Sequence, residues 1–172
     1  MKPKLDRIAA ELYSIGMAKT QLVIPTIRNI REAELLAHKF PAVITAGPDR
    51  TEVQFGHPNH HVQVFDDTTW GKDSPTHKDI EDILKFSSKN PGEILIHCHA
   101  GMSRSTSTAI GVLIQRGLDP FDAFDTLAER HPRKRPFIPN VKVMEILEDI
   151  FGIEGLAQYS VENEYFPEMS VY

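Results

Sequence analysis

One short segment near the middle of the chain carries residues whose types and spacing could perform nucleophilic chemistry. Its sequence is Ile94-Leu95-Ile96-His97-Cys98-His99-Ala100-Gly101-Met102-Ser103-Arg104-Ser105, and Cys98 is the only cysteine in 172 residues. The apolar start of the segment is typical of a strand that ends at His97, and a helical pattern opens at Arg104. A lone thiol between a strand end and a helix start can be a nucleophile that is held against a bound anion.

The spacing indicates which anion this segment could hold. Backbone N–H groups at the start of a helix have no intrahelical partner, and the helix dipole adds positive charge there. A tight loop that contains Gly101 can turn several N–H groups inward and cradle a tetrahedral oxyanion. Arg104 follows Cys98 by six residues, so its planar fork could hold two phosphate oxygens above the thiol. The same positive field stabilises a thiolate that can attack phosphorus.

These residues resemble a known signature. His97-Cys98-x-x-Gly101-x-x-Arg104-Ser105 matches the His-Cys-x5-Arg-Ser/Thr pattern of the cysteine-dependent protein tyrosine phosphatase superfamily, and residues 100–105 look most like its dual-specificity phosphatase-like branch. The resemblance implies a phospho-cysteine intermediate on Cys98, a hydrogen bond from Ser105 to the departing sulfur, and a loop-orienting role for His97. It implies phosphate binding by the loop residues, which are His99, Ala100, Gly101, Met102, Ser103 and Arg104. The competing interpretation of Cys98 is a small buried hydrophobic residue.

A leaving alkoxide or phenoxide also needs a proton, and a positioned carboxylic acid can supply it. Asp66 and Asp67 follow the alternating run 61–65, which is typical of a strand. In the family that the signature resembles, the acid follows an apolar-x-apolar-x-Asp strand about thirty residues before the cysteine. Asp66 fits that register, so we expect Asp66 to be the general acid, with Asp67 as the alternative acid. Asp73 ranks third because its register does not fit.

The rest of the chain alternates β-type and helical patterns. Strands are expected at 21–25, 42–45, 61–65 and 93–97, and helices at 30–39, 74–88, 104–116, from 120 onward and at 140–151. This order predicts an α/β fold with a single domain: a largely parallel central sheet of four to five strands, flanked by helices on both faces as in the phosphotyrosine phosphatases. The active loop is then expected at the carboxyl end of a central strand.

The domain organisation follows from the extent of the resemblance. We expect residues 1–20 to form an N-terminal extension packed on the domain, residues 20–152 to form the phosphatase domain, and residues 153–172 to form a loosely packed C-terminal tail. Residues 137–140, Phe-Ile-Pro-Asn, resemble the family's apolar-x-Pro-Asn start of its last helix. There Asn140 would cap the helix and brace the phosphate loop, or act as an ordinary N-cap.

Composition narrows the class of protein and its partners. A content of 41% hydrophobic residues suits a full core, and a net charge of −5 argues against a general nucleic-acid binder. One cysteine excludes an internal disulfide framework, which predicts a reducing, cytoplasmic location. The sequence shows neither a secretory signal nor 18 consecutive apolar residues, so we expect no membrane partner. The sequence leaves the oligomeric state open.

Two other clusters, of histidines and of basic residues, contain side chains that could bind a ligand. The histidines around 57–61 and 97–99 lack helical ligand spacing, so we expect no metal and no cofactor. His99 and Met102 are expected at the rim of the pocket. Residues 133–135, Arg-Lys-Arg, are either a solvated connection or, if they lie beside the pocket, an attraction for acidic phosphosubstrates.

The sequence leaves several functions open. The leading hypothesis is a phosphatase for phosphotyrosine, with phosphoserine and phosphothreonine as further substrates of a phosphoprotein. The alternatives are a small-molecule, nucleotide or phosphoinositide phosphatase with the same machinery, and a non-catalytic phosphate-binding module. The phosphate loop contains no lysine. Phosphoinositide phosphatases of the superfamily usually carry basic residues at the variable positions of this loop, so inositol lipids are a less favoured substrate class.

Overall fold

A four-stranded parallel sheet positions the Cys98 segment. The computed structural model describes residues 22–47 and 56–167. In the described chain the strands are β1 (Thr26–Arg28), β2 (Ala42–Gly47), β3 (His60–Val64) and β4 (Ile94–His97), in the order β1-β4-β2-β3. All pairs are parallel, and β4 is an inner strand. The predicted α/β architecture is therefore confirmed. The carboxyl end of β4, where the Cys98 segment begins, lies between β1 and β2.

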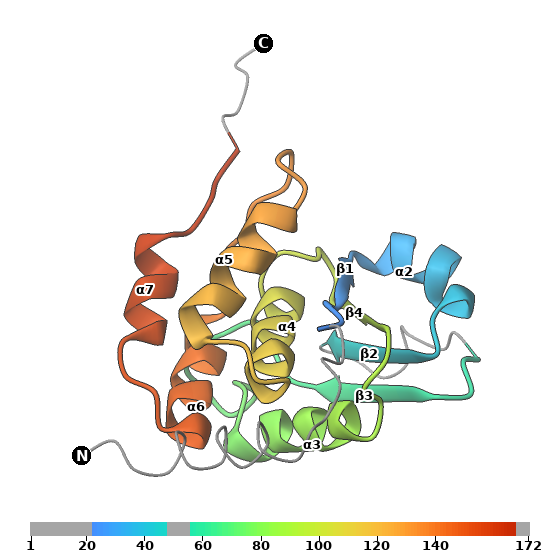
Figure 1. Ribbon diagram of the computed structural model, residues 1–172, viewed down its shortest axis with the longest axis horizontal. Helices are drawn as coiled ribbons and strands as arrows, with labels where there is room; N and C mark the ends of the chain where they lie inside the picture. Colours follow the sequence, from blue (N-terminus) through green and yellow to red (C-terminus); the bar gives the residue numbers. More distant parts are fainter. Residues whose placement is uncertain (1–21, 48–55, 168–172) are drawn as a thin grey trace.

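Helices cover both faces of this sheet (Figure 1). On one face lies α2 (Ile30–Leu36), continued by the short 3-10 helix η1 (Ala37–Lys39). On the other face lie α3 (His77–Ser88), α4 (Arg104–Gln115), α5 (Pro120–Arg130), α6 (Val141–Phe151) and α7 (Leu156–Glu162). Side chains alternate along β4 accordingly: Leu95 packs in a small cluster with Ala33 of α2, whereas Ile96 belongs to the main core.

Side-chain caps fix where two of the helices begin. Asn29 accepts the Glu32 N–H, and Glu32 accepts the Asn29 N–H, so α2 begins at Ile30 as predicted. The helix expected from 74 begins instead at His77, because Thr76 and Asp79 form the same reciprocal cap. Local hydrogen bonds therefore place this boundary three residues after the predicted start at Ser74.

The first strand lies further along the chain than predicted. The apolar run 21–25 was expected to pair, but β1 covers Thr26–Arg28, and residue 21 lies outside the described residues. In this register Arg28 pairs with His97, the last residue of β4. Pro25 carries no N–H for a sheet ladder, which favours a strand that begins after it.

The segment beyond Gly152 corrects another expectation. Residues 153–167 are not a loose tail, because α7 buries Leu156 completely in the main core. Tyr165 then pairs with Phe137 through two backbone hydrogen bonds of 2.9 and 3.0 Å. The expected N-terminal extension 1–20 lies outside the described residues, and the division of the chain into domains stays a prediction. None of the described helices is long and apolar enough to span a membrane.

The packing of α7 gives a stability prediction. Leu156→Ala should lower the free energy of unfolding by about 2–4 kcal/mol, because it removes a fully buried side chain. Val161→Ala on the same helix is the control, since Val161 is 50% exposed, and it should change stability by no more than about 0.5 kcal/mol. Urea unfolding of both variants measures the difference. Equal stability of the two variants would mean that α7 does not belong to the core.

Candidate active site

The loop from Cys98 to Ser103, here called the Cys98 loop, joins β4 to α4. Gly101 has φ +72°, and a Cβ there would lie 2.9 Å from the Arg28 carbonyl carbon and 2.9 Å from the Asn29 nitrogen. The loop therefore runs against the end of β1 at a distance that only glycine permits. The Ile30 N–H also donates to the His99 carbonyl, at 3.1 Å, so the start of α2 fixes the loop.

Two hydrogen-bonding groups lie close to the Cys98 sulfur. The Gly101 N–H donates to the sulfur at 3.2 Å, and the Ser105 hydroxyl lies 3.1 Å from it. Only 4% of Cys98 is exposed. The sulfur also sits at the N-terminal end of α4, where the helix dipole favours an anion. The structure therefore brings Cys98, Gly101 and Ser105 together, as the signature predicts.

The Arg104 side chain is buried and only partly satisfied. Its Nη1 donates to the backbone carbonyl of Phe65 at 3.1 Å, and the residue is 8% exposed. Its Nε is buried without a hydrogen-bond partner in the described part of the chain. A buried guanidinium with an unpaired N–H is stabilised when an anionic oxygen binds there. Arg104 thus keeps one buried N–H donor that no described residue uses.

The two candidate acids lie in different surroundings. Asp67 Oδ1 accepts hydrogen bonds from Ser103 Oγ at 2.7 Å and from Asn140 Nδ2 at 2.8 Å. The Asp66 backbone N–H donates to the Asp73 carbonyl at 2.7 Å. The Asp66 carboxylate has no hydrogen bond within the described residues, and Asp66 lines a hollow of about 490 Å³ before α3. The structure therefore brings the Asp67 carboxylate, not that of Asp66, to the Cys98 loop.

His97 contacts the first residue of the Cys98 loop. It is fully buried, and its Nδ1 lies 3.3 Å from the Cys98 carbonyl oxygen. Burial lowers the pKa of His97 to about 4, although the hydrogen bond to Cys98 raises it. The ring is neutral at pH 7, so it does not act as the acid. Its Nε2 lies 2.6 Å from Thr45 Oγ1. The sequence did not predict this contact, and its one signal is that Thr45 is a polar residue in the otherwise apolar, buried strand β2.

Two later segments border the loop. Asn140 caps α6 by accepting the Val143 N–H at 3.1 Å, and the Ile138 N–H donates to the Met102 carbonyl at 3.2 Å. The cap role of Asn140 is confirmed, and its Nδ2 donates to Asp67, which in turn accepts from Ser103 of the Cys98 loop. Arg135 pairs with Glu32 at 3.2 Å, and its Nη1 would lie 3.0 Å from a Cβ at Gly101. The basic segment 133–135 therefore contacts the Cys98 loop through Arg135.

The remaining loop residues differ in exposure. His99 is exposed, and Ala100 and Met102 are half-buried. Across residues 22–47 and 56–167, no three side chains of His, Cys, Asp or Glu are grouped so that they could hold a metal ion.

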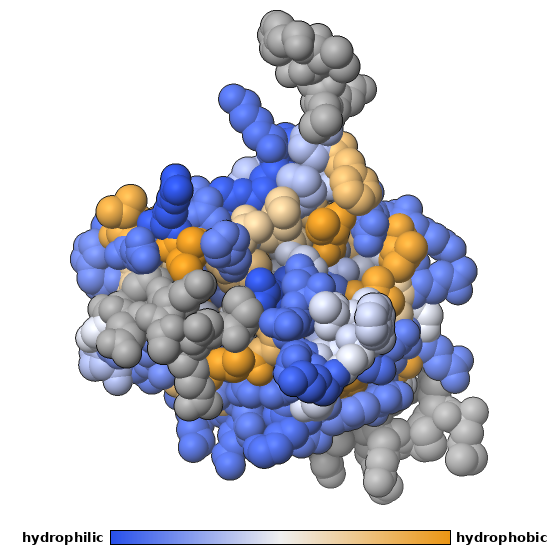
Figure 2. All heavy atoms as spheres, turned by 180° about the vertical axis from the view of Figure 1, so that it is seen from behind, coloured by the Kyte–Doolittle hydropathy of each residue, from blue (hydrophilic) through white to orange (hydrophobic). Residues whose placement is uncertain are grey.

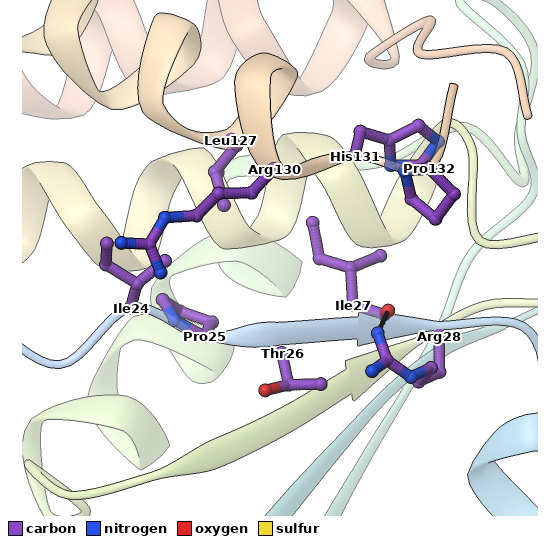
Figure 3. A pocket seen from close by; sticks show the side chains of 9 residues that line it. All are labelled: Ile24, Pro25, Thr26, Ile27, Arg28, Leu127, Arg130, His131 and Pro132. Atoms are coloured by element: carbon purple, nitrogen blue, oxygen red, sulfur yellow. Dashed lines mark hydrogen bonds between the residues drawn. The ribbon is translucent and has the colours of Figure 1, made fainter.

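A separate groove runs along β1, the edge strand of the described sheet. It holds about 210 Å³ between this strand and the end of α5 (Figure 3). Ile27 and Leu127 give it an apolar side, Arg130 extends over Ile24 at one end, and Arg28 turns back to the Ile27 carbonyl. On the surface shown in Figure 2, apolar side chains form separate spots among polar ones. The groove is distinct from the Cys98 loop.

Comparisons with solved structures bear on the fold. DUSP15 superposes with a TM-score of 0.59 at 20% identity, over 87% of this chain and 97% of that one. Human DUSP28 gives 0.56 at 19% identity, over 73% and 89%. PTPMT1 in complex with PI(5)P gives 0.51 at 18% identity, over 82% and 91%. Neither a family model nor a curated protein matches the sequence.

The fold is therefore that of the cysteine-dependent phosphatases, in the form found in dual-specificity phosphatases. The resemblance drawn from the signature at 97–105 is confirmed at the level of the fold.

The contact of Gly101 with β1 gives a second prediction. Gly101→Ala should weaken binding of inorganic phosphate roughly tenfold or more, because the added Cβ meets backbone atoms and the positive φ is strained. Gly117→Ala is the control: Gly117 also has a positive φ, of 93°, but nothing lies within 4 Å of its Cβ position. Calorimetric titration with phosphate measures both variants. Unchanged phosphate affinity in Gly101→Ala would contradict the account of the loop.

Proposed function

We propose that this protein is a cysteine-dependent phosphatase that hydrolyses phosphomonoesters through a phospho-cysteine on Cys98. The observations that carry the proposal are the buried Nε–H of Arg104, which has no partner among the described residues, and the Cys98 thiol, which accepts the Gly101 N–H. A buried cation with a free donor, a nucleophilic sulfur and a helix N-terminus together suit one ligand, a phosphoryl group.

The reaction follows from these positions. The Cys98 thiolate attacks phosphorus in line, so an S–P bond forms as the P–O bond to the leaving group breaks. Arg104 and the loop amides bind the three equatorial oxygens, whose charge persists in a loose transition state. Asp66 donates its proton to the leaving oxygen. The resulting carboxylate takes a proton from water, water oxygen attacks phosphorus, and phosphate leaves while Ser105 donates a hydrogen bond to the departing thiolate.

The contacts of Asp67 favour Asp66 as the acid. One oxygen of Asp67 already accepts two hydrogen bonds, from Ser103 and Asn140. A carboxylate held in this way anchors its loop to the Cys98 loop and is less available to a leaving group. Asp66 is adjacent, half-buried and without such bonds within the described residues, so its carboxyl group is the less constrained of the two.

The substrate class we propose is a phosphoprotein, with phosphotyrosine first and phosphoserine or phosphothreonine next, acted on in the cytoplasm. The fold of the dual-specificity neighbours supports this class. A second candidate is a phosphoinositide, because one structure of this fold is a complex with PI(5)P. The absence of lysine from the Cys98 loop favours the phosphoprotein. A panel of phosphopeptides and phosphoinositides, compared by kcat/KM, separates the two.

The nucleophile is tested by Cys98→Ser. This variant should lower turnover of p-nitrophenyl phosphate roughly a thousandfold or more, because an alcohol is a far weaker nucleophile than a thiolate at pH 7. It should still bind a phosphotyrosine peptide, and the unphosphorylated peptide serves as the control. If the variant turns over substrate at the wild-type rate, the thiolate mechanism is wrong. If the wild type binds the phosphopeptide but hydrolyses nothing, the protein is a binding module.

The acid is tested by Asp66→Asn and Asp67→Asn on two aryl phosphates. Phenyl phosphate needs a proton for its leaving group, whereas p-nitrophenolate leaves with little help. Asp66→Asn should lower kcat for phenyl phosphate roughly 10²–10⁴-fold and for p-nitrophenyl phosphate much less. Asp67→Asn should lower both by a similar, smaller factor, because it only loosens the anchor. A leaving-group dependence confined to Asp67→Asn would move the acid to Asp67.

A further inference from the structure

Three polar side chains form a continuous line of hydrogen bonds that ends at the Cys98 loop. Thr45 Oγ1, on β2, lies 2.6 Å from His97 Nε2 and 2.7 Å from His60 Nε2. His97 Nδ1 then faces the Cys98 carbonyl. Thr45 is 1% exposed and His97 is fully buried, so bulk water does not replace the Thr45–His97 bond.

The chemistry of the groups sets the direction of this line. The Cys98 carbonyl can only accept, so the hydrogen of a neutral His97 ring is on Nδ1 and its Nε2 is an acceptor. The Thr45 hydroxyl must therefore donate its single hydrogen to His97 Nε2. Thr45 Oγ1 then accepts, and its donor is the Nε2–H of His60. Hydrogen bonds thus run from His60 through Thr45 and His97 to the Cys98 carbonyl.

The surroundings keep both rings neutral, as this direction requires. Burial lowers the pKa of His60 to about 4, with further lowering by His57 and His61. The pKa of His97 is lowered to about 4 by burial, with an additional contribution from His60. Both rings are therefore uncharged at pH 7, where a phosphatase of this kind works with a thiolate.

We propose that His60 and Thr45 are positioning residues for the reaction at Cys98: they hold His97 in the tautomer that donates to the Cys98 carbonyl. The inference rests on the proposed function, because it concerns the nucleophile of that reaction. Neither residue belongs to the signature at 97–105. Thr45 lies on β2 and His60 on β3, whereas the signature begins at the end of β4.

The tautomer matters because the Cys98 carbonyl begins the loop. With the hydrogen on Nε2, a lone pair on His97 Nδ1 would face the carbonyl oxygen 3.3 Å away, and the two acceptors would repel. The Cys98–His99 peptide would then turn. The Gly101 N–H lies 3.2 Å from the sulfur, and such a turn would disturb that bond. Loss of the line therefore weakens the stabilisation of the thiolate, and hydrogen bonds in such a chain reinforce one another.

Four variants of the full chain test the proposal. Thr45→Val removes the hydroxyl with little change in shape, and His60→Leu removes the N–H donor. His60→Gln keeps an N–H near the position of Nε2 and should rescue the effect. His61→Leu is the matched control, because His61 instead bonds Gln63 and stacks on Phe86.

The main readout is the midpoint pH for alkylation by iodoacetamide, which reports the thiolate at the only cysteine of the chain. Thr45→Val and His60→Leu should raise this midpoint by roughly 0.5–1 pH unit, which corresponds to one buried hydrogen bond. Their kcat should fall roughly three- to tenfold with KM unchanged. His60→Gln and His61→Leu should match the wild type. Nitrogen-15 NMR should find the hydrogen of His97 on Nδ1 in the wild type.

The following results would overturn the proposal or the proposed function. Equal midpoints in all four variants, or His97 with its hydrogen on Nε2 in the wild type, would overturn the proposal. A His60→Gln variant that behaves as His60→Leu would show that the ring itself, not its N–H, matters, and would also overturn it. The proposed function fails separately: a wild-type midpoint near that of a free thiol, about 8.5, would remove the activated nucleophile, whatever the variants do.

Discussion

The bond between the Arg104 guanidinium and the Phe65 carbonyl is the interaction on which the rest of the site depends. It joins the start of α4 to the segment that carries Asp66 and Asp67. A buried cation whose Nε–H is unpaired is costly to keep, and a bound oxyanion offsets that cost. The bond thus orients the cation and ties the start of α4 to the segment of the candidate acids, while the Nε–H stays available to an oxyanion.

The parallel sheet explains why these groups meet. The strands β2, β3 and β4 lie side by side and point the same way, so their carboxyl ends share one edge. Thr45 near the end of β2 lies between His97 on β4 and His60 on β3. The loops after β3 and β4 then contact each other through Asp67 and Ser103. One edge of the sheet therefore holds the proposed nucleophile Cys98, the proposed phosphate ligand Arg104 and the candidate acids.

The sequence was informative wherever the relevant atoms belong to consecutive residues. The motif at 97–105 predicted the strand end, the loop and the helix start, because all three are local, and Asn29 with Glu32 predicted the start of α2. The sequence did not predict contacts that depend on backbone atoms or on side chains far apart in the chain. The Phe65 carbonyl has no side-chain signature, and the anchor at Asp67 joins residues from three segments. The helix α7 was missed because its stability comes from packing Leu156 against a core that forms elsewhere.

The most direct measurement of the central claim is a crystal structure of the wild-type protein with tungstate, a tetrahedral oxyanion that mimics phosphate. The account predicts tungstate in the Cys98 loop above the sulfur, with Arg104 Nε donating to one of its oxygens and Arg104 still bonded to the Phe65 carbonyl. A structure in which the loop is empty at saturating tungstate, or in which the ion binds elsewhere and Arg104 has left the Phe65 carbonyl, would contradict it.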